Sequence, residues 1–163
     1  MLEKNDNEKS QEEIIQSYFI EHGLTLSVAE SCTGGAIAAR LTKIAGASNY
    51  FLGGIVSYSN SMKEKLLGVP RSTLDTKGAV CEETATAMVL GVIRATGSDV
   101  GIAVTGVAGP AGGSKDKPVG TVWIAIAKKG EIPLCNRYNF NGDRITIIEQ
   151  SVRKVLEMIE GLI

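Results

Sequence analysis

Residues 24–41 read LTLSVAESCTGGAIAARL, and this stretch decides how the chain folds. Its first part, LTLSVAE, has the apolar character of a buried strand. After the two glycines, small apolar residues recur at the spacing of a tightly packed helix. The segment AESCTGG (29–35) therefore lies where a strand ends and a helix begins, which is where open α/β sheets bind ligands.

The rest of the chain alternates between helical and strand-like patterns. We expect helices at 10–23, 60–67 (with Asn60 as N-cap), 81–97 and 143–159, and strands at 51–60, 99–106, 121–127 and 132–140. Residues 69–78 are interpreted as a connector, 106–120 as a long glycine-rich loop and 1–8 as a disordered or frayed tail. This order predicts an α/β fold, a three-layer α/β/α sandwich with a mixed β-sheet, formed as a single domain by residues 9–163.

Composition limits the classes of function. The 163 residues include 17 basic and 18 acidic ones, a net charge of −1, so we expect no nucleic-acid partner. The three cysteines, Cys32, Cys81 and Cys135, form no CxxC pair and fit a reduced cytoplasmic protein. The N-terminus is polar and no apolar run approaches about 18 residues, so we expect neither a signal peptide nor a membrane partner.

Polar residues gather in three segments, 29–35, 46–63 and 104–120. In the first, Ser31 or Thr33 could simply cap a helix, or the turn could cradle a phosphate or carboxylate, and the segment alone does not decide. The third is long for a loop of a compact domain, which favours a function. It contains no Walker A pattern, and AESCTGG contains no GxGxxG, so usual nucleotide motifs have no support.

The residue types also limit the catalytic mechanism. The only histidine, His22, falls at the end of the first helix, so neither a histidine-based triad nor a multi-histidine metal site is expected. A serine nucleophile would then need a lysine or carboxylate base. Lys63 fits if burial lowers its pKa, although KEKLL (63–67) also reads as a solvated helix face. The pattern does not choose among the candidate nucleophiles Ser31, Ser48, Ser57 and Ser59.

Four segments in order resemble the CinA C-terminal domain family, whose stand-alone members are nicotinamide mononucleotide (NMN) amidases. They are AESCTGG, AGASNYFLGGIVSYSNSMKEKLLGV (45–69), GAV (78–80) before a helix, and VTGVAGPAGGSKDKPVGTVW (104–123). The resemblance covers residues from about 13 to 160. It implies hydrolysis of NMN to nicotinate mononucleotide and ammonia, in pyridine-nucleotide salvage, by a Ser/Lys mechanism without metal or cofactor.

The resemblance also implies roles for particular residues. It places the nucleophile at Ser48 and the base at Lys63, and it assigns oxyanion or substrate positioning to Ser31, Tyr58 and Thr105. Substrate phosphate and ribose are expected at the glycine-bearing turns, namely at Thr33, Gly34, Gly35, Gly106, Gly109, Gly112 and Gly113. Cys81 departs from the family pattern, which often has serine after GAV.

Two other functions remain open at this stage. The same pocket would suit a nucleotide-binding or protein-interaction module related to competence/damage-inducible proteins, with little or no catalysis. Another small amide could equally replace NMN as the substrate. The presence of both Ser48 and Lys63 favours an enzyme, since a pure binder does not need that pair. A homo-oligomer is left open, and the glycine-bearing strand FLGGIVSY is one place where another backbone could approach closely.

Overall fold

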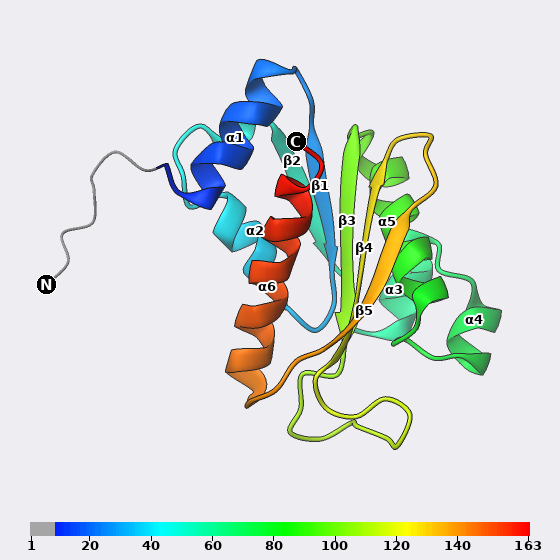
Figure 1. Cartoon of the computed structure of the whole chain (residues 1–163). Coiled ribbons are helices and arrows are strands. Elements are labelled where there is room, and N and C mark those ends of the chain that lie inside the picture. The colour runs from blue at the N-terminus through cyan, green and yellow to red at the C-terminus, as the bar shows by residue number, and fades with distance from the viewer. Residues whose placement is uncertain (1–8) are drawn as a thin grey trace, which may run out of the picture.

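Five strands form one mixed sheet, in the spatial order β2-β1-β3-β4-β5, in the computed structural model, which describes residues 9–163 (Figure 1). The strands are β1 (Leu26–Glu30), β2 (Phe51–Val56), β3 (Val100–Gly106), β4 (Thr121–Lys128) and β5 (Leu134–Asn139). The helices are α1 (Gln11–Glu21), α2 (Ala36–Leu41), α3 (Asn60–Leu67), α4 (Arg71–Thr76), α5 (Glu82–Thr96) and α6 (Arg144–Glu160), with a 3₁₀ helix η1 (Ala47–Asn49). The tail predicted at residues 1–8 lies outside the described residues.

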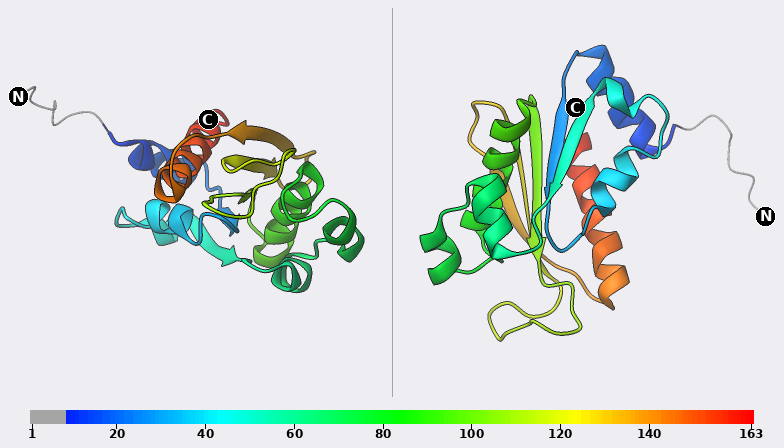
Figure 2. Two further views of the ribbon diagram at one scale, coloured as in Figure 1. Left: turned by 90° about the horizontal axis from the view of Figure 1, so that it is seen from below. Right: turned by 180° about the vertical axis from the view of Figure 1, so that it is seen from behind.

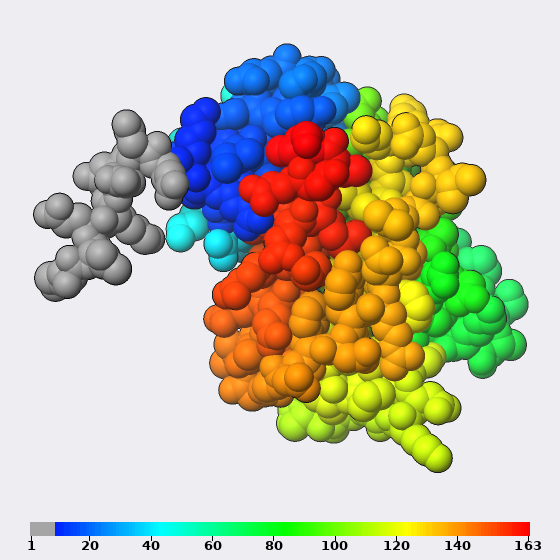
Figure 3. All heavy atoms as spheres, viewed as in Figure 1, coloured from blue at the N-terminus to red at the C-terminus, as the bar shows by residue number. Residues whose placement is uncertain are grey.

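The direction of the strands brings the polar segments together. β2, β1 and β3 run parallel, and β4 and β5 add to β3 as antiparallel strands. Parallel neighbours end at the same edge of a sheet, so the segments that follow β1, β2 and β3 meet there. This edge lies at the lower end of the molecule in Figures 1 and 3, where the loop between β3 and β4 projects.

Helices cover both faces of the sheet, which confirms the predicted three-layer sandwich. α1, α2 and α6 lie on one face, and α3 and α5 lie on the other (Figure 2). Larger side chains such as those of Val28 and Ile102 face the layer of α1, α2 and α6. The next residue along each of these strands faces α5 and is small. These small residues are Ala29, Ala103 and Ala125. Because alanine occupies little volume, α5 packs close to the sheet. None of the helices within residues 9–163 is both long enough and apolar enough to cross a bilayer.

Helix ends follow the capping signals in the sequence. The Ser10 side chain accepts from the Glu13 amide in a capping box, and Asp143 caps α6 by accepting from the Thr146 amide at 2.8 Å. The expected cap of α3 was misplaced by one residue, because Ser59 rather than Asn60 accepts from an amide of the first turn.

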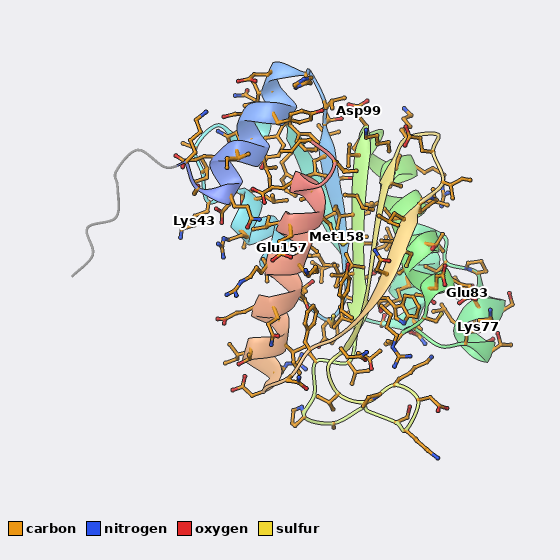
Figure 4. All side chains as sticks on the ribbon, in the orientation of Figure 1. Lys43, Lys77, Glu83, Asp99, Glu157 and Met158 are labelled. Carbon is orange, nitrogen blue, oxygen red and sulfur yellow. The ribbon has the colours of Figure 1, made fainter. Side chains whose placement is uncertain are left out.

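The segment 69–78 was expected to be a connector, but it contains α4. This helix is only six residues long and buries a single side chain, Leu74, so it produces no periodic signal. Lys77, the C-cap residue that follows α4, forms an ion pair with Glu83 and so links α4 to α5, and both side chains are labelled in Figure 4. At the top of the same view Asp99 binds the amide and hydroxyl of Thr25, at the edge opposite the glycine-rich loop.

Gly91 on α5 allows this helix to touch the end of α3. A Cβ at position 91 would lie 2.0 Å from the carbonyl oxygen of Leu67. Because that atom belongs to the backbone, no side-chain rotation relieves the overlap, and we expect Gly91→Ala to lower the free energy of unfolding by about 1–3 kcal/mol. Urea denaturation measures this. Leu90→Ala, at the exposed neighbouring position, is the control and should change stability by less than about 0.5 kcal/mol. Equal stability of the two variants would contradict the close packing of α3 on α5.

Candidate active site

A cavity of about 270 Å³ opens at the edge where β1 and β3 end. Its polar side chains come from different elements. Ser31 follows β1, Tyr58 follows β2, Lys63 lies on α3, Thr105 belongs to β3 and Arg144 begins α6. The glycine-rich loop after β3 supplies another wall. This is the usual location of ligand sites in open α/β sheets.

Glu30 organises the turn AESCTGG. Its buried carboxylate accepts hydrogen bonds from the Thr33 hydroxyl at 2.6 Å and from the amides of Gly35, Ile37 and Ala38 at 3.1, 3.1 and 2.8 Å. These amides lie at the start of α2, whose N-cap Gly35 has no side chain to bind them, so Glu30 satisfies them instead. Gly35 adopts a φ of +102°, which favours glycine. Much of the motif is therefore a capping device.

The Ser31 hydroxyl and the Lys63 amine are in contact inside the cavity. Lys63 Nζ lies 2.9 Å from Ser31 Oγ and donates a second hydrogen bond, of 2.7 Å, to the carbonyl of Ser57. The Lys63 side chain is only 1% exposed. None of the ion pairs formed by residues 9–163 includes it. A buried amine without a carboxylate beside a hydroxyl is the arrangement of a nucleophile with its base.

The surroundings of Lys63 favour its neutral form. Burial lowers the pKa of its ammonium group from 10.5, because the charged form loses hydration, while Cys32 has a smaller opposing effect. Lys63 also lies in the first half of α3, where the positive end of the helix dipole disfavours a cation. A lowered pKa increases the fraction of neutral amine, which is the form that accepts a proton.

Cys32 is the other nucleophilic side chain in the wall of the cavity. Burial raises the pKa of its thiol to about 12, in spite of the nearby positive charges of Lys63 and Arg144. The group therefore stays protonated near neutral pH, whereas the thiolate is the nucleophilic form. Ser31 is the better nucleophile candidate for this reason.

Arg144 connects two walls of the cavity. Its Nη2 donates to the Tyr58 hydroxyl at 2.5 Å, and its Nη1 donates to the carbonyl of Gly109 at 2.8 Å. The Thr105 hydroxyl donates to the Ala79 carbonyl at 2.7 Å and ties the end of β3 to the segment before α5. The cavity thus presents a guanidinium group beside the Ser31–Lys63 pair.

The structure does not bring Ser48 to Lys63. Ser48 is exposed in η1, before β2, whereas Lys63 comes after β2 on α3. β2 contains six residues, which at about 3.3 Å per residue separate the two positions by roughly 20 Å. The pair expected from the resemblance therefore does not form within one chain, and Ser31 occupies the place beside Lys63.

The other predicted positions divide into two groups. Ser31, Tyr58 and Thr105 line the cavity, together with three of the loop glycines, Gly106, Gly109 and Gly112. The remaining positions lie outside its wall, and these are Thr33, Gly34, Gly35 and Gly113. Of these, Thr33 and Gly35 bind Glu30. A role of these positions in holding the substrate stays a prediction.

Arg144 is the residue that the sequence analysis missed. Asp143 was correctly predicted to cap the last helix, but no local pattern shows that the start of this helix lies next to residues 31 and 63. One signal was present, since an arginine directly after the cap lies at the positive end of the helix dipole, where a cation is unfavourable. A residue placed against local preference is a reason to suspect a function.

A larger hollow, of about 710 Å³, lies between α2 and α6, on the face of the sheet that α1, α2 and α6 cover. Its charged side chains are of both signs, and Lys43 and Glu157, two of them, are labelled in Figure 4. The charged side chains that line this hollow are exposed. Its lining contains no buried lysine in contact with a serine hydroxyl, as Lys63 is with Ser31. The smaller cavity is therefore the candidate active site.

This chain is similar to known proteins both in sequence and in structure. The family model described as CinA C-terminal domain matches residues 8–163. A CinA-like protein from Geotalea uraniireducens is 55% identical over 131 residues, which cover 80% of this chain and 31% of the relative. A putative competence-damage inducible protein from Desulforudis audaxviator is 46% identical over 152 residues, which cover 93% of this chain and 37% of the relative. The chain thus spans about a third of the length of these relatives.

Solved structures share the fold. The competence/damage inducible protein CihA from Agrobacterium tumefaciens matches with a TM-score of 0.87 and 40% identity, over 94% of this chain and 96% of that one. The competence damage-inducible protein A (ComA) from Klebsiella pneumoniae matches with a TM-score of 0.88 and 35% identity, over 94% and 98%. By sequence and by structure, the chain belongs to the CinA C-terminal domain family.

Proposed function

We propose that this chain is an amidohydrolase that converts NMN and water to nicotinate mononucleotide and ammonia. The observation that carries the proposal is the buried contact of 2.9 Å between Ser31 and Lys63 in an open cavity. The resemblance to the stand-alone amidases supplies the substrate. The names of the matched proteins refer to competence and damage and state no reaction, so the chemistry rests on the site itself.

Lys63 serves as base and then as acid in this proposal. Its neutral amine accepts the proton of Ser31 while Oγ attacks the carboxamide carbon and forms a tetrahedral intermediate. The Lys63 ammonium then returns the proton to the departing nitrogen, and ammonia leaves a nicotinyl ester on Ser31. Water hydrolyses the ester by the same proton path in reverse, giving the carboxylate product and free Ser31.

The remaining groups of the cavity suit the rest of the substrate. The Arg144 guanidinium is the natural partner of the NMN phosphate, because planar guanidinium groups bind phosphate through paired hydrogen bonds. Tyr58 holds this guanidinium from one side and the Gly109 carbonyl holds it from the other. Thr105 also lines the cavity, but its hydroxyl donates its hydrogen to the Ala79 carbonyl, so we assign it the positioning of the cavity wall rather than donation to the oxyanion.

The test is ammonia release from NMN by the purified protein and by Ser31→Ala. We expect the wild type to release ammonia and the variant to lose activity by on the order of 10³-fold or more, because Ser31 has the only hydroxyl within residues 9–163 that is hydrogen-bonded to Lys63. Ser72→Ala removes an exposed hydroxyl on α4 and serves as the control with unchanged activity. Full activity of Ser31→Ala would refute the proposed nucleophile. A wild type that binds NMN without releasing ammonia would instead be a nucleotide-binding module.

A further inference from the structure

The hydroxyl of Ser57 is buried next to the candidate active site and has no hydrogen-bond partner. Ser57 directly follows β2, its side chain is 0% exposed, and its Oγ is one of three buried side-chain oxygens without a partner among residues 9–163. The other two belong to Gln16 on α1 and Thr121 at the start of β4, and neither residue is hydrogen-bonded to Lys63. Because an unpaired buried hydroxyl costs free energy, its presence beside the site points to a role there.

The pairing of β1 with β2 places Ser57 opposite Ser31. The parallel register ends with Glu30 opposite Val56. It continues one residue past both strands, because the Ser57 amide donates to the Glu30 carbonyl at 2.8 Å. Residues that are opposite each other on neighbouring strands direct their side chains to the same face of the sheet. The two serine side chains are therefore neighbours on one face.

This face is the one covered by the helix that carries Lys63. Alternate residues of a strand share a face, so Ser31 and Ser57 share the face of Ala29 and Ile55, which stand two residues earlier. Ala29 and Ile55 belong to the apolar cluster that α3 and α5 form with the sheet. Both hydroxyls thus lie on the side of the sheet from which Lys63 reaches the end of β1.

Lys63 lacks one acceptor when it carries a proton. Its Nζ contacts Ser31 Oγ at 2.9 Å and the carbonyl oxygen of Ser57 at 2.7 Å. These two contacts satisfy a neutral amine that donates to the carbonyl and accepts from the hydroxyl. An ammonium group has three hydrogens, and the hydrogen bonds within residues 9–163 offer no acceptor for the third.

We propose that Ser57 is a positioning residue whose hydroxyl accepts this third hydrogen. When Lys63 takes the proton of Ser31, the ammonium donates to Ser31 Oγ, to the Ser57 carbonyl oxygen and to Ser57 Oγ. The hydroxyl reaches Nζ by rotation about the single side-chain torsion of serine. It thereby stabilises the charge on Lys63 while the tetrahedral intermediate exists, and this catalytic part rests on the proposed function.

The titration of Lys63 tests the contact without reference to any activity. It is followed by the NMR signal of the Lys63 Cε group, assigned as the signal that Lys63→Met lacks. An acceptor for the third hydrogen favours the ammonium form, so we expect Ser57→Ala to titrate at a lower pH than the wild type. Thr121→Val removes another buried unpaired hydroxyl, on a strand that does not adjoin β1 or β2, and should titrate as the wild type does. An unchanged midpoint in Ser57→Ala would overturn the proposal.

The neighbouring ionisable groups are the same in these three proteins, so a difference in midpoint is assigned to residue 57. They are Cys32, Tyr58 and Arg144 in the cavity, Glu30 at the end of β1, Glu64 and Lys65 on α3, Arg71 on α4, and Arg94 of α5, which donates to the Leu67 carbonyl.

Turnover and stability should respond differently to the loss of this hydroxyl. In Ser57→Ala we expect kcat for ammonia release from NMN to fall about 10- to 100-fold, because a hydrogen bond to a charged group is lost. KM should stay the same, since Ser57 is not among the residues that line the cavity. The melting temperature should stay the same or rise, because the variant no longer buries an unpaired hydroxyl. Ser57→Thr keeps the hydroxyl and should retain most of kcat.

The outcomes separate this proposal from the proposed function. An active wild type with unchanged kcat in Ser57→Ala, or a loss of kcat that comes with a lower melting temperature, would overturn the role of Ser57 and leave the amidase standing. An inactive wild type in which the titration of Lys63 still depends on Ser57 would refute the amidase and leave the contact supported.

Discussion

Lys63→Met is expected to abolish amide hydrolysis and to leave the fold intact. Methionine is unbranched and uncharged, so it fills the space of the buried lysine stem. The variant loses both the base that takes the Ser31 proton and the acid that protonates ammonia. We expect the turnover of NMN to fall by on the order of 10²–10⁴-fold. Ammonia release measures the loss. If the variant turned over NMN as fast as the wild type, Lys63 would have no role in catalysis.

The pH dependence distinguishes a base from a merely structural lysine. Catalysis needs the neutral amine, and burial lowers the pKa of Lys63 below 10.5, so activity should rise with pH and level off before 10.5. Stability should follow the same direction. Between the lowered pKa and the normal one the unfolded chain binds more protons, so the free energy of unfolding rises with pH. Lys63→Met should lack both of these slopes, and Lys65→Met, at an exposed position of the same helix, should keep them.

Glu30→Ala is expected to cause the largest loss of stability. The substitution leaves the Thr33 hydroxyl and the amides of Gly35, Ile37 and Ala38 without their acceptor in a largely buried turn. We expect the free energy of unfolding to fall by roughly 3–5 kcal/mol, since each buried donor left unpaired costs about 1–3 kcal/mol and partial access of water reduces the sum. Urea denaturation followed by circular dichroism measures the loss.

Two further variants separate the causes of that loss. Glu64→Ala removes an exposed carboxylate whose ion pair with Arg71 is worth at most about 1 kcal/mol, so it is the control. Glu30→Gln keeps one acceptor oxygen and removes the charge, and its stability should lie between those of the wild type and Glu30→Ala. If Glu30→Ala were as stable as Glu64→Ala, the carboxylate would not be what holds the start of α2.

Most of the fold could be predicted because its signals are local. Ser10 and Asp143 mark helix starts through their own hydrogen bonds, and Gly97 ends α5 in the left-handed conformation that the sequence suggested. α4 was not predicted, because it is short and buries only Leu74. Periodicity indicates a helix only when several side chains repeat on one face.

The site could be predicted only in part, because it depends on the order of strands in space. The pattern located polar segments at strand ends, but it could not say which serine meets Lys63. Ser31 and Lys63 are 32 residues apart, and they meet because β1 and β2 are parallel neighbours that end at one edge. Ser48 belongs to the same motif as Lys63, but it precedes β2 and therefore lies at the opposite end of that strand. The resemblance located both residues without showing that a strand separates them.

The row formed by Ala29, Ala103 and Ala125, together with Gly91 at the contact of α5 with α3, sets the thickness of one half of the molecule. That thickness determines whether Lys63 reaches Ser31, because Lys63 lies on α3, and α3 packs on α5, which covers this face of the sheet. A larger side chain in the row would lift the helices and draw the amine away from the hydroxyl without altering either group. Mutations deep in the core would then be recorded as losses of turnover in a protein that still folds.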